Sequence, residues 1–337
     1  MMWTWSQAQL VLLGRFLAER GLCGPTVSTE PIGDGHSNLT FLVSDGRSRV
    51  VVRRPPPPPL PPGAHDVLRE ARLLSALAQT NVPTPRVLAT AAADELLDVP
   101  LLVMDFVDGA VITESTPAPQ DDQQLRRRIG ESLVDTLAEL HTVAWREVGL
   151  GDFGKPDGFN ARQLRRMRSL VAADGAVPHT FAALDEWLHA HLPPESATSI
   201  VHNDFRIGNM IVDIRAGNVA AVLDWELATV GDPLADLGYL LASYPVPGEP
   251  LVATSALGTA VLEPGYPTRT ELLDRYANST GADVSQVNWY ATLSMYKLAA
   301  LYEYSRRRFE SGVGDPYYAD PGLVTAFLAA GEHLAGE

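Results

Sequence analysis

The stretch VHNDFRIGNMIV, residues 201–212, carries an unusual number of polar side chains between apolar ends. Val201 opens it and Met210 begins its apolar end, so the pattern predicts a strand, a turn and a second strand. A solvated surface loop and a catalytic loop both fit this pattern, and only other parts of the chain can distinguish them. The polar residues are His202, Asn203, Asp204, Arg206 and Asn209.

A second acidic residue favours the catalytic interpretation. Asp224 ends the apolar run AAVLDWE at residues 220–226. A carboxylate at a strand end beside a hairpin loop is a suitable Mg²⁺ ligand, and Asn209 can add a neutral oxygen. Asp204 would then orient a substrate hydroxyl and accept its proton. A positioned nucleophile and a metal that offsets phosphate charge are what phosphoryl transfer requires.

The overall composition narrows the class of protein. A length of 337 residues favours two domains or one bilobal unit. The net charge of -15 argues against a general nucleic-acid or membrane-surface binder, because both need a dominant basic surface. No apolar run reaches the roughly 18 residues of a membrane span, and residues 10–22 predict an amphipathic helix instead of a signal peptide. We therefore expect a cytoplasmic protein.

Cys23 is the only cysteine. The sequence therefore has no intrachain disulfide and no cysteine-based zinc site. Nothing near Cys23 supports a role as a nucleophile.

The first 110 residues predict mainly strands. Residues 27–46 contain apolar stretches around a glycine turn, Asp45-Gly46 predicts a hairpin turn, and residues 48–54 form the returning strand. The proline run that follows cannot form a helix or an inner strand and predicts a stiff surface connector; a polyproline ligand for a partner is the alternative. The proline run covers residues 55–64. After it we expect a helix over 65–80, a turn leading into a strand over 81–90, and a strand over 100–109.

The rest of the chain is mainly helical, with one small hairpin embedded in it. A long amphipathic helix is predicted over 122–143, and helices are predicted again over 270–310 and 320–335. The order indicates an α+β protein in which an antiparallel-sheet lobe precedes a helical lobe. The inward residues of the long helix should be Leu125, Ile129, Leu133, Leu137 and Leu140.

Three motifs in this order resemble the aminoglycoside phosphotransferase family, which has the protein-kinase-like bilobal fold. VHNDFRIGNMIV resembles its H-x-D-x-x-x-x-N loop, LDWE resembles its metal-binding segment, and GDPLADLGYLL at 231–241 resembles its following acidic signature. The likeness covers most of the chain and is greatest to the branch related to domains fused to acyl-CoA dehydrogenases. It implies a nucleotide-binding lobe over 1–107 and a helical lobe with the catalytic loop and acceptor site over 108–337.

The resemblance assigns roles within these motifs. Asp204 would be the catalytic base, and Asn209 and Asp224 would hold Mg²⁺. His202 would brace the loop as a structural histidine, and Asp236 would also be structural. Asn203 stands where the family often has glycine, a mild change because asparagine tolerates a left-handed backbone.

The resemblance also implies that the first lobe binds ATP. The turn over 32–43 would cover the phosphates, where glycines allow close approach and two polar side chains donate hydrogen bonds. Kinases place a lysine where this chain has VVVRRP, so we expect Arg53 to bind phosphate and to pair with Glu70, while Arg54 faces out. Met104 would support the adenine, while the Asp105 carbonyl and the Val107 amide would bind its edge. The turn residues are Gly33, Gly35, Ser37 and Asn38.

The acceptor is expected to be a small hydroxylated molecule bound by the helical lobe. The stretch MYKLAALYEYSRRRF at 295–309 mixes aromatic and basic residues, which suits an anionic or amphipathic acceptor; a core helix with a solvated basic end is the alternative. The acyl-CoA-dehydrogenase-related branch points to a hydroxy-acyl compound. The candidate acceptor residues are Arg206, Glu226, Tyr296, Lys297, Tyr302, Glu303 and Arg306.

Three other functions compete with this hypothesis. One is a catalytically silent kinase-fold protein that binds a nucleotide or partner, which the missing strand lysine supports. Another is an aminoglycoside antibiotic kinase, and the third is a protein kinase. The sequence has no APE segment, and its DFG at 152–154 precedes the 201–212 loop, so neither can build an activation loop after it.

Overall fold

The computed structural model describes residues 5–33, 38–56, 65–117, 122–172 and 175–336. The contacts divide the chain into two compact units. One unit combines Met1–Asp108 with the short segment Ala220–Glu226, and the other combines Gly109–Val219 with Leu227–Glu337. Of the proline run, residues 57–64 lie outside the described residues, so its function as a connector stays a prediction.

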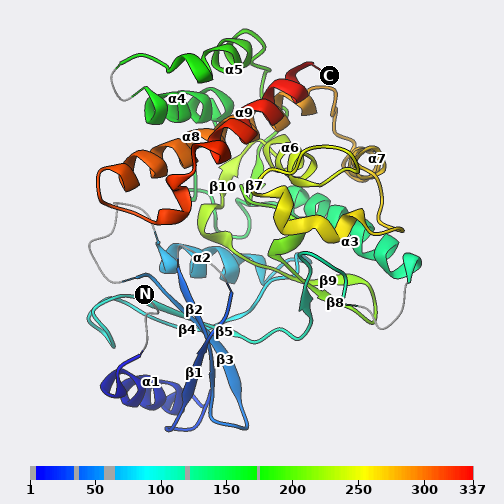
Figure 1. The fold of residues 1–337 in the computed structure, drawn as a ribbon. Coiled ribbons are helices and arrows are strands. Elements are labelled where there is room, and N and C mark those ends of the chain that lie inside the picture. The colour runs from blue at the N-terminus through cyan, green and yellow to red at the C-terminus, as the bar shows by residue number, and fades with distance from the viewer. Residues whose placement is uncertain (1–4, 34–37, 57–64, 118–121, 173–174, 337) are drawn as a thin grey trace. The chain divides into compact units, whose positions relative to one another are not determined.

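The first unit is built on one antiparallel sheet (Figure 1). Its strand order is β1-β2-β3-β5-β4, and β3 pairs with β5 in a register that places Arg53 opposite Leu102 and Val51 opposite Met104. Helix α1 (Gln7–Glu19) precedes the sheet and α2 (Val67–Leu77) follows its third strand. The strands are β1 (Ser28–Pro31), β2 (Leu39–Ser44), β3 (Arg49–Arg54), β4 (Val87–Ala91) and β5 (Leu101–Asp105).

The two faces of this sheet have different roles because side chains alternate along a strand. Val50 and Val52 face a core that includes Phe16 and Leu17 of α1, whereas Arg53 lies on the other face. The prediction that Arg54 faces out is wrong. Arg54 is 5% exposed and lies against the rings of Trp5 and Phe41, because the segment that leads into α1 covers this face of the sheet.

The second unit is mainly helical. The expected long helix is α3 (Gln123–Thr142), and its five predicted inward residues are all buried. Asp122 caps its first turn by accepting a hydrogen bond from the Leu125 amide. The other helices are α4 (Phe159–Val171), α5 (His179–Ala190), α6 (Leu234–Ser243), α7 (Arg269–Thr280), α8 (Val287–Glu310) and α9 (Pro321–Gly336).

Short strands and 3₁₀ turns connect these helices. β7 (Ser199–Val201) pairs with β10 (Thr229–Gly231), and a small sheet has the order β6-β8-β9 with β6 at Ala110–Val111. The predicted embedded hairpin is β8 (Met210–Asp213) and β9 (Asn218–Val222). The 3₁₀ turns are η1 (Ile207–Asn209), η2 (Trp225–Leu227), η3 (Ser255–Leu262) and η4 (Pro316–Ala319).

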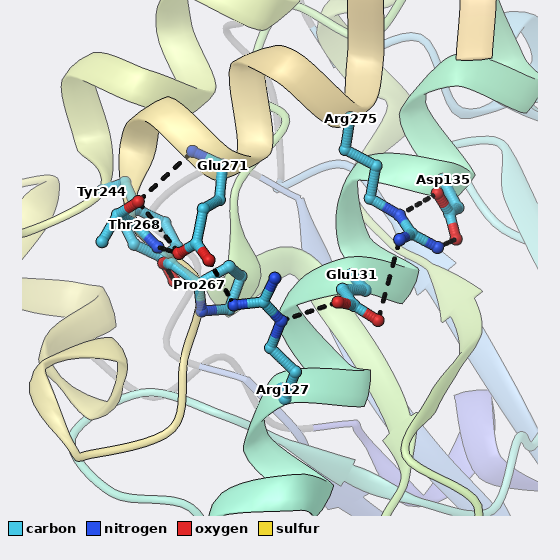
Figure 2. A network of polar contacts seen from close by, with 8 residues as sticks. All are labelled: Arg127, Glu131, Asp135, Tyr244, Pro267, Thr268, Glu271 and Arg275. Carbon is cyan, nitrogen blue, oxygen red and sulfur yellow. Dashed lines mark hydrogen bonds and ion pairs between the residues drawn. The ribbon is translucent and has the colours of Figure 1, made fainter. Parts of the chain in front are cut away.

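Helices α3 and α7 are joined by a network of arginines and carboxylates (Figure 2). Arg127 bonds Glu131 on its own helix and Glu271 on α7, each at 2.6 Å. Arg275 of α7 holds both carboxylate oxygens of Asp135, at 2.6 and 2.8 Å. This network links α3 to α7 at the surface of the helical unit.

Candidate active site

The loop after β7 is anchored by a buried carboxylate of α6. Asp236 accepts hydrogen bonds from the backbone amides of His202 at 2.6 Å and Asn203 at 2.7 Å. Burial alone would raise the pKa of Asp236, but hydrogen bonding to His141, the charges of the two histidines and the His202 amide lower it. Asp236 therefore has the structural role predicted for it.

His202 and Asn203 shape the loop as expected. His202 is fully buried, and its Nδ1 accepts a hydrogen bond from the Asp204 amide at 3.2 Å. Asn203 has a φ of 66°, which confirms the predicted left-handed backbone. Its side chain also connects the loop to α8, because Nζ of Lys297 lies 3.4 Å from its Oδ1.

The Asp204 carboxylate is held through both of its oxygens. The Tyr239 hydroxyl donates to Oδ1, and the Asn209 amide nitrogen donates to Oδ2 at 2.7 Å. A second bond joins Asn209 Nδ2 to the Asp204 carbonyl at 2.8 Å, which directs the amide oxygen of Asn209 away from Asp204. Arg206 also lies here, with Nε 3.4 Å from Asp204 Oδ1. Tyr239 was missed in the sequence, although the spacing of Asp236 and Tyr239 on one helix was a usable signal.

A second polar cluster lies in the first unit around Arg53. Its Nη1 donates to Glu70 at 3.1 Å, so the predicted pair is formed. Its Nη2 donates to Asp224 at 2.5 Å and lies 3.5 Å from Glu226. Glu226 in turn accepts a hydrogen bond from Asn38 at 2.8 Å. The structure thus groups Glu226, a predicted acceptor residue, with the nucleotide and metal candidates.

This cluster contains more negative than positive charge. Burial raises the pKa of Glu70 to about 7, and the charges of Asp224 and Glu226 add to this rise while Arg53 opposes it. One guanidinium therefore does not neutralise its three carboxylate neighbours. A divalent cation is the kind of ligand that such a cluster favours.

The candidate metal ligands belong to different units. Asn209 lies in the second unit and Asp224 in the first. Among the described residues, no three His, Cys, Asp or Glu side chains are placed to hold a metal ion. Mg²⁺ commonly takes only one or two protein carboxylates and completes its shell with water and phosphate oxygens. The oxygen donors of Asp224, Glu226 and Asn209 are of the type that fits this ion.

The remaining nucleotide candidates are placed in part. Gly33 has a φ of 80°, a conformation that glycine adopts without strain, whereas Gly35 and Ser37 lie outside the described residues. Met104 is buried on β5, and the Asp105 side chain binds the backbone amide and Nε of Arg86, both at 2.7 Å. Val107 follows the strand and is half-buried.

The acceptor candidates on α8 are divided by the helix faces. Tyr296 is fully buried and donates to Asp185 at 2.8 Å, so it belongs to the core and is not open to an acceptor. Arg306 pairs with Glu303 on its own helix, at 2.7 and 2.9 Å. Tyr302 packs edge-on against Phe327. Burial raises the pKa of Tyr302 and the Arg206 charge opposes this rise, so Tyr302 lies within electrostatic range of the loop that carries Arg206.

Lys297 is a second cation near this loop. Burial lowers its pKa to about 8, although the charges of Asp236 and Asp204 act in the opposite direction. Near Asp204 the second unit therefore presents the cations Arg206 and Lys297 and the aromatic Tyr302.

In the described part of the chain, no helix is long and apolar enough to cross a membrane.

The sheet-plus-helix architecture and the loop-held carboxylate define a kinase-like phosphotransferase fold. A sequence model described as "Phosphotransferase enzyme family" matches residues 28–272. The chain therefore belongs to this family, and the predicted resemblance is confirmed. The family, by this description, is one of phosphotransferase enzymes.

Two solved structures and one curated relative are similar to the chain. A Ralstonia eutropha protein assigned to the aminoglycoside phosphotransferases is 28% identical with a TM-score of 0.79, covering 96% of this chain and 97% of that one. A thermostable mutant of aminoglycoside phosphotransferase APH(4)-Ia, in complex with AMP-PNP and hygromycin B, is 14% identical with a TM-score of 0.62, covering 96% and 98%; it shows the fold alone. Mouse acyl-CoA dehydrogenase family member 10 is 31% identical over 87% of this chain, which spans only 28% of that relative.

Proposed function

We propose that the enzyme transfers the γ-phosphoryl group of ATP to the hydroxyl of a small anionic molecule of the hydroxy-acyl class. The observation that carries the proposal is the Asp204 carboxylate, held by Tyr239 and Asn209 on a loop of a family phosphotransferase. A carboxylate fixed in this way can orient one hydroxyl for attack, which is the main catalytic task in phosphoryl transfer.

In the proposed reaction the acceptor oxygen forms a bond to the γ-phosphorus. The bond from that phosphorus to the bridging oxygen breaks, and ADP leaves with the electron pair. Asp204 accepts the proton of the acceptor hydroxyl. Mg²⁺, when bound by Asp224 and Asn209, would neutralise charge on the phosphate oxygens.

ATP as the donor is supported by the Arg53 cluster and by related structures. The family resemblance assigns phosphate contacts to Arg53 and Asn38, and both side chains bond carboxylates of this cluster. The distant relative APH(4)-Ia was solved with AMP-PNP. The Arg53 guanidinium, which presents two donors, can serve as the phosphate contact for which kinases use a lysine.

The choice of an anionic acceptor follows from charges near Asp204. Arg206 and Lys297 are cations beside the loop, and a polycationic aminoglycoside would have to bind next to both. A carboxylate or thioester-bearing acceptor would be attracted instead. The likeness to a protein named as an acyl-CoA dehydrogenase family member supports the hydroxy-acyl class.

An acceptor screen tests this function. The chain is incubated with ATP and Mg²⁺, and ADP release and product mass are followed with short hydroxy acids, hydroxyacyl-CoA thioesters, kanamycin and hygromycin B. We expect phosphorylation of a hydroxy-acyl compound. Efficient phosphorylation of the aminoglycosides alone would contradict the acceptor class, and no transfer to any compound would contradict the acceptors proposed here.

The role of Asp204 is tested with the acceptor that the screen identifies. Asp204→Asn should reduce kcat by roughly 10²-fold or more because the proton acceptor is lost. Asp283→Asn, an exposed acid of the same unit, is the matched control and should leave kcat unchanged. Full activity of Asp204→Asn would exclude Asp204 as the base.

A further inference from the structure

Helix α6 contacts the catalytic loop through two side chains on one face. Asp236 and Tyr239 are three residues apart, a spacing that places side chains on the same side of an α-helix. Asp236 binds the backbone amides at the start of the loop, at His202 and Asn203. Tyr239 reaches the Asp204 carboxylate, the next residue along. One helix face therefore fixes both the path of the loop and its reactive side chain.

The rotation of α6 is itself fixed by α8. A Cβ atom on Gly238 would lie 2.6 Å from the Ala291 amide nitrogen and from the Tyr290 carbonyl carbon. Only glycine permits this close approach of the two helices. Because the contact is with backbone atoms, α6 cannot turn about its axis without losing it, and Tyr239 is held toward Asp204.

The Tyr239 hydroxyl can act only as a hydrogen-bond donor to the carboxylate. Tyr239 is 7% exposed, and burial together with the Asp204 charge raises its pKa well above its usual range, so the proton stays on the phenol oxygen. Asn209 donates to the other carboxylate oxygen at 2.7 Å. With one donor on each oxygen, the carboxylate plane has a single defined orientation.

We propose that Tyr239 is a positioning residue that sets the orientation of the Asp204 carboxylate toward the acceptor hydroxyl. This inference rests on the proposed role of Asp204 as the base. The Tyr239 hydroxyl occupies one lone pair of Asp204 Oδ1, and Arg206 Nε approaches the same oxygen. The acceptor hydroxyl must therefore bond to another lone pair of the Asp204 carboxylate. Tyr239 thereby restricts the side from which an acceptor can be activated.

Kinetics of Tyr239→Phe test this role, because the substitution removes only the hydroxyl. With the acceptor found in the screen, kcat should fall roughly 10- to 100-fold through misorientation of the base. The KM for ATP should change by less than about twofold, since ground-state nucleotide binding does not involve Tyr239. The matched control is Tyr244→Phe, which removes another buried hydroxyl, bonded to the Pro267 carbonyl at 2.9 Å, and should retain kcat.

A double-mutant cycle separates positioning from general stability. In the Asp204→Asn background, Tyr239→Phe should have almost no further effect on kcat because the group it positions has already lost its function. If Tyr239→Phe lowered kcat by the same factor in the unmodified chain and in the Asp204→Asn chain, the proposal would be overturned. An unchanged kcat in Tyr239→Phe, or equal losses in the two tyrosine variants, would also overturn it.

A spectroscopic measurement tests the contact without turnover. In protein labelled with carbon-13 at tyrosine Cζ, the resonance that disappears in Tyr239→Phe identifies Tyr239. Asp204→Ala should shift this resonance, whereas Asp283→Ala should leave it in place. An unshifted resonance in Asp204→Ala would overturn the proposal even for an active enzyme. If the unmodified chain phosphorylates none of the acceptors, the proposed function fails while this measurement still judges the contact.

Discussion

Arg53, which stands where the family resemblance expects a lysine, contacts three carboxylates. Its two terminal nitrogens hold Glu70 and Asp224 at the same time, which the single ammonium of a lysine, a point charge, does less readily. A third carboxylate, Glu226, lies farther away, at 3.5 Å from the Arg53 guanidinium. Glu70, the most buried of the three, relieves part of the excess negative charge by taking up a proton, because its pKa is raised to about 7.

Glu70 should therefore make stability depend on pH. Its folded pKa of about 7 lies above its unfolded value, so the folded state binds more protons between about pH 4.5 and pH 7. The contribution of Glu70 is fully present below pH 4.5 and is lost as pH rises through 7. Relative to the unmodified chain, Glu70→Gln should gain on the order of 3 kcal/mol in unfolding free energy between pH 4.5 and pH 8.

Urea unfolding in EDTA at the two pH values measures this difference. Glu19→Gln on α1, an exposed position, is the control and should show the same difference from the unmodified chain at both pH values. A Glu70→Gln curve that runs parallel to that of the unmodified chain would show that Glu70 does not take up a proton in the folded state.

At the scale of single residues, the sequence identified candidate site residues better than it identified the side chains that surround them. Asp204, Asn209 and the Arg53–Glu70 pair could be found because motif spacing and strand period are local signals. Arg206, Tyr296 and Arg54 could not be placed, because their surroundings come from segments far away in the chain. Arg54 alternates with Arg53 as predicted, yet its face is covered by Trp5, which the strand period does not show.

At the scale of elements, the α3–α7 network joins two helices whose sequences are far apart. Glu271 has two roles there: it accepts from the Thr268 amide at 2.7 Å as part of a capping box, and it binds Arg127 (Figure 2). These hydrogen bonds, led by that of the Thr268 backbone, lower the pKa of Glu271 to about 2. Its stabilising effect is present above pH 4.5 and is lost as pH falls through 2.

Two substitutions at Glu271 should separate its roles. Glu271→Ala removes the cap and the ion pair and should lower the unfolding free energy by about 1 kcal/mol at pH 7. Glu271→Gln keeps the capping geometry and should cost less, because an exposed ion pair contributes little. Urea unfolding measures both, with Asp274→Asn on the same helix as the control. Equal costs for the two variants would mean that the cap contributes nothing.

Most helices and strands could be predicted because their hydrophobic periods are strong. The helix α3 and the strands β3 and β5 lie close to the predicted ranges. Helices α4 and α5 were not assigned individually, since their segments carry weaker signals than α3. The contact that orients α6 depends on Gly238, whose close approach to α8 is a property of packing and not of the local sequence.

At the scale of the whole molecule, the α+β fold and the family could be predicted from three ordered motifs. The acceptor could not, because net charge averages over the surface while Arg206 and Lys297 determine the charge near Asp204.

The proposed function makes a prediction for the chain as a unit. Binding of ATP with Mg²⁺ should raise the thermal midpoint, by the equivalent of about 2.7 kcal/mol at 100 times Kd.

Thermal unfolding with ATP and either Mg²⁺ or EDTA measures this stabilisation. The increase should require the metal and should be much smaller in Asp224→Asn. Asp108→Asn, which changes an exposed acid paired with Arg49, should respond like the unmodified chain. An equal increase for Asp224→Asn would argue against a metal role for Asp224.

The segment Ala220–Glu226 has a consequence for how the protein is made. It belongs to the first unit but follows the Gly109–Val219 part of the second unit in the sequence, so the ribosome must produce residues 109–226 before the first unit has all its parts. At translation speeds this takes on the order of ten seconds. During that time Arg53 is paired with Glu70 at most, and two of its carboxylate neighbours have not yet been synthesised. The nascent N-terminal sheet must therefore remain soluble with an incomplete polar cluster, and a stalled chain ending near residue 110 should be a substrate for chaperones.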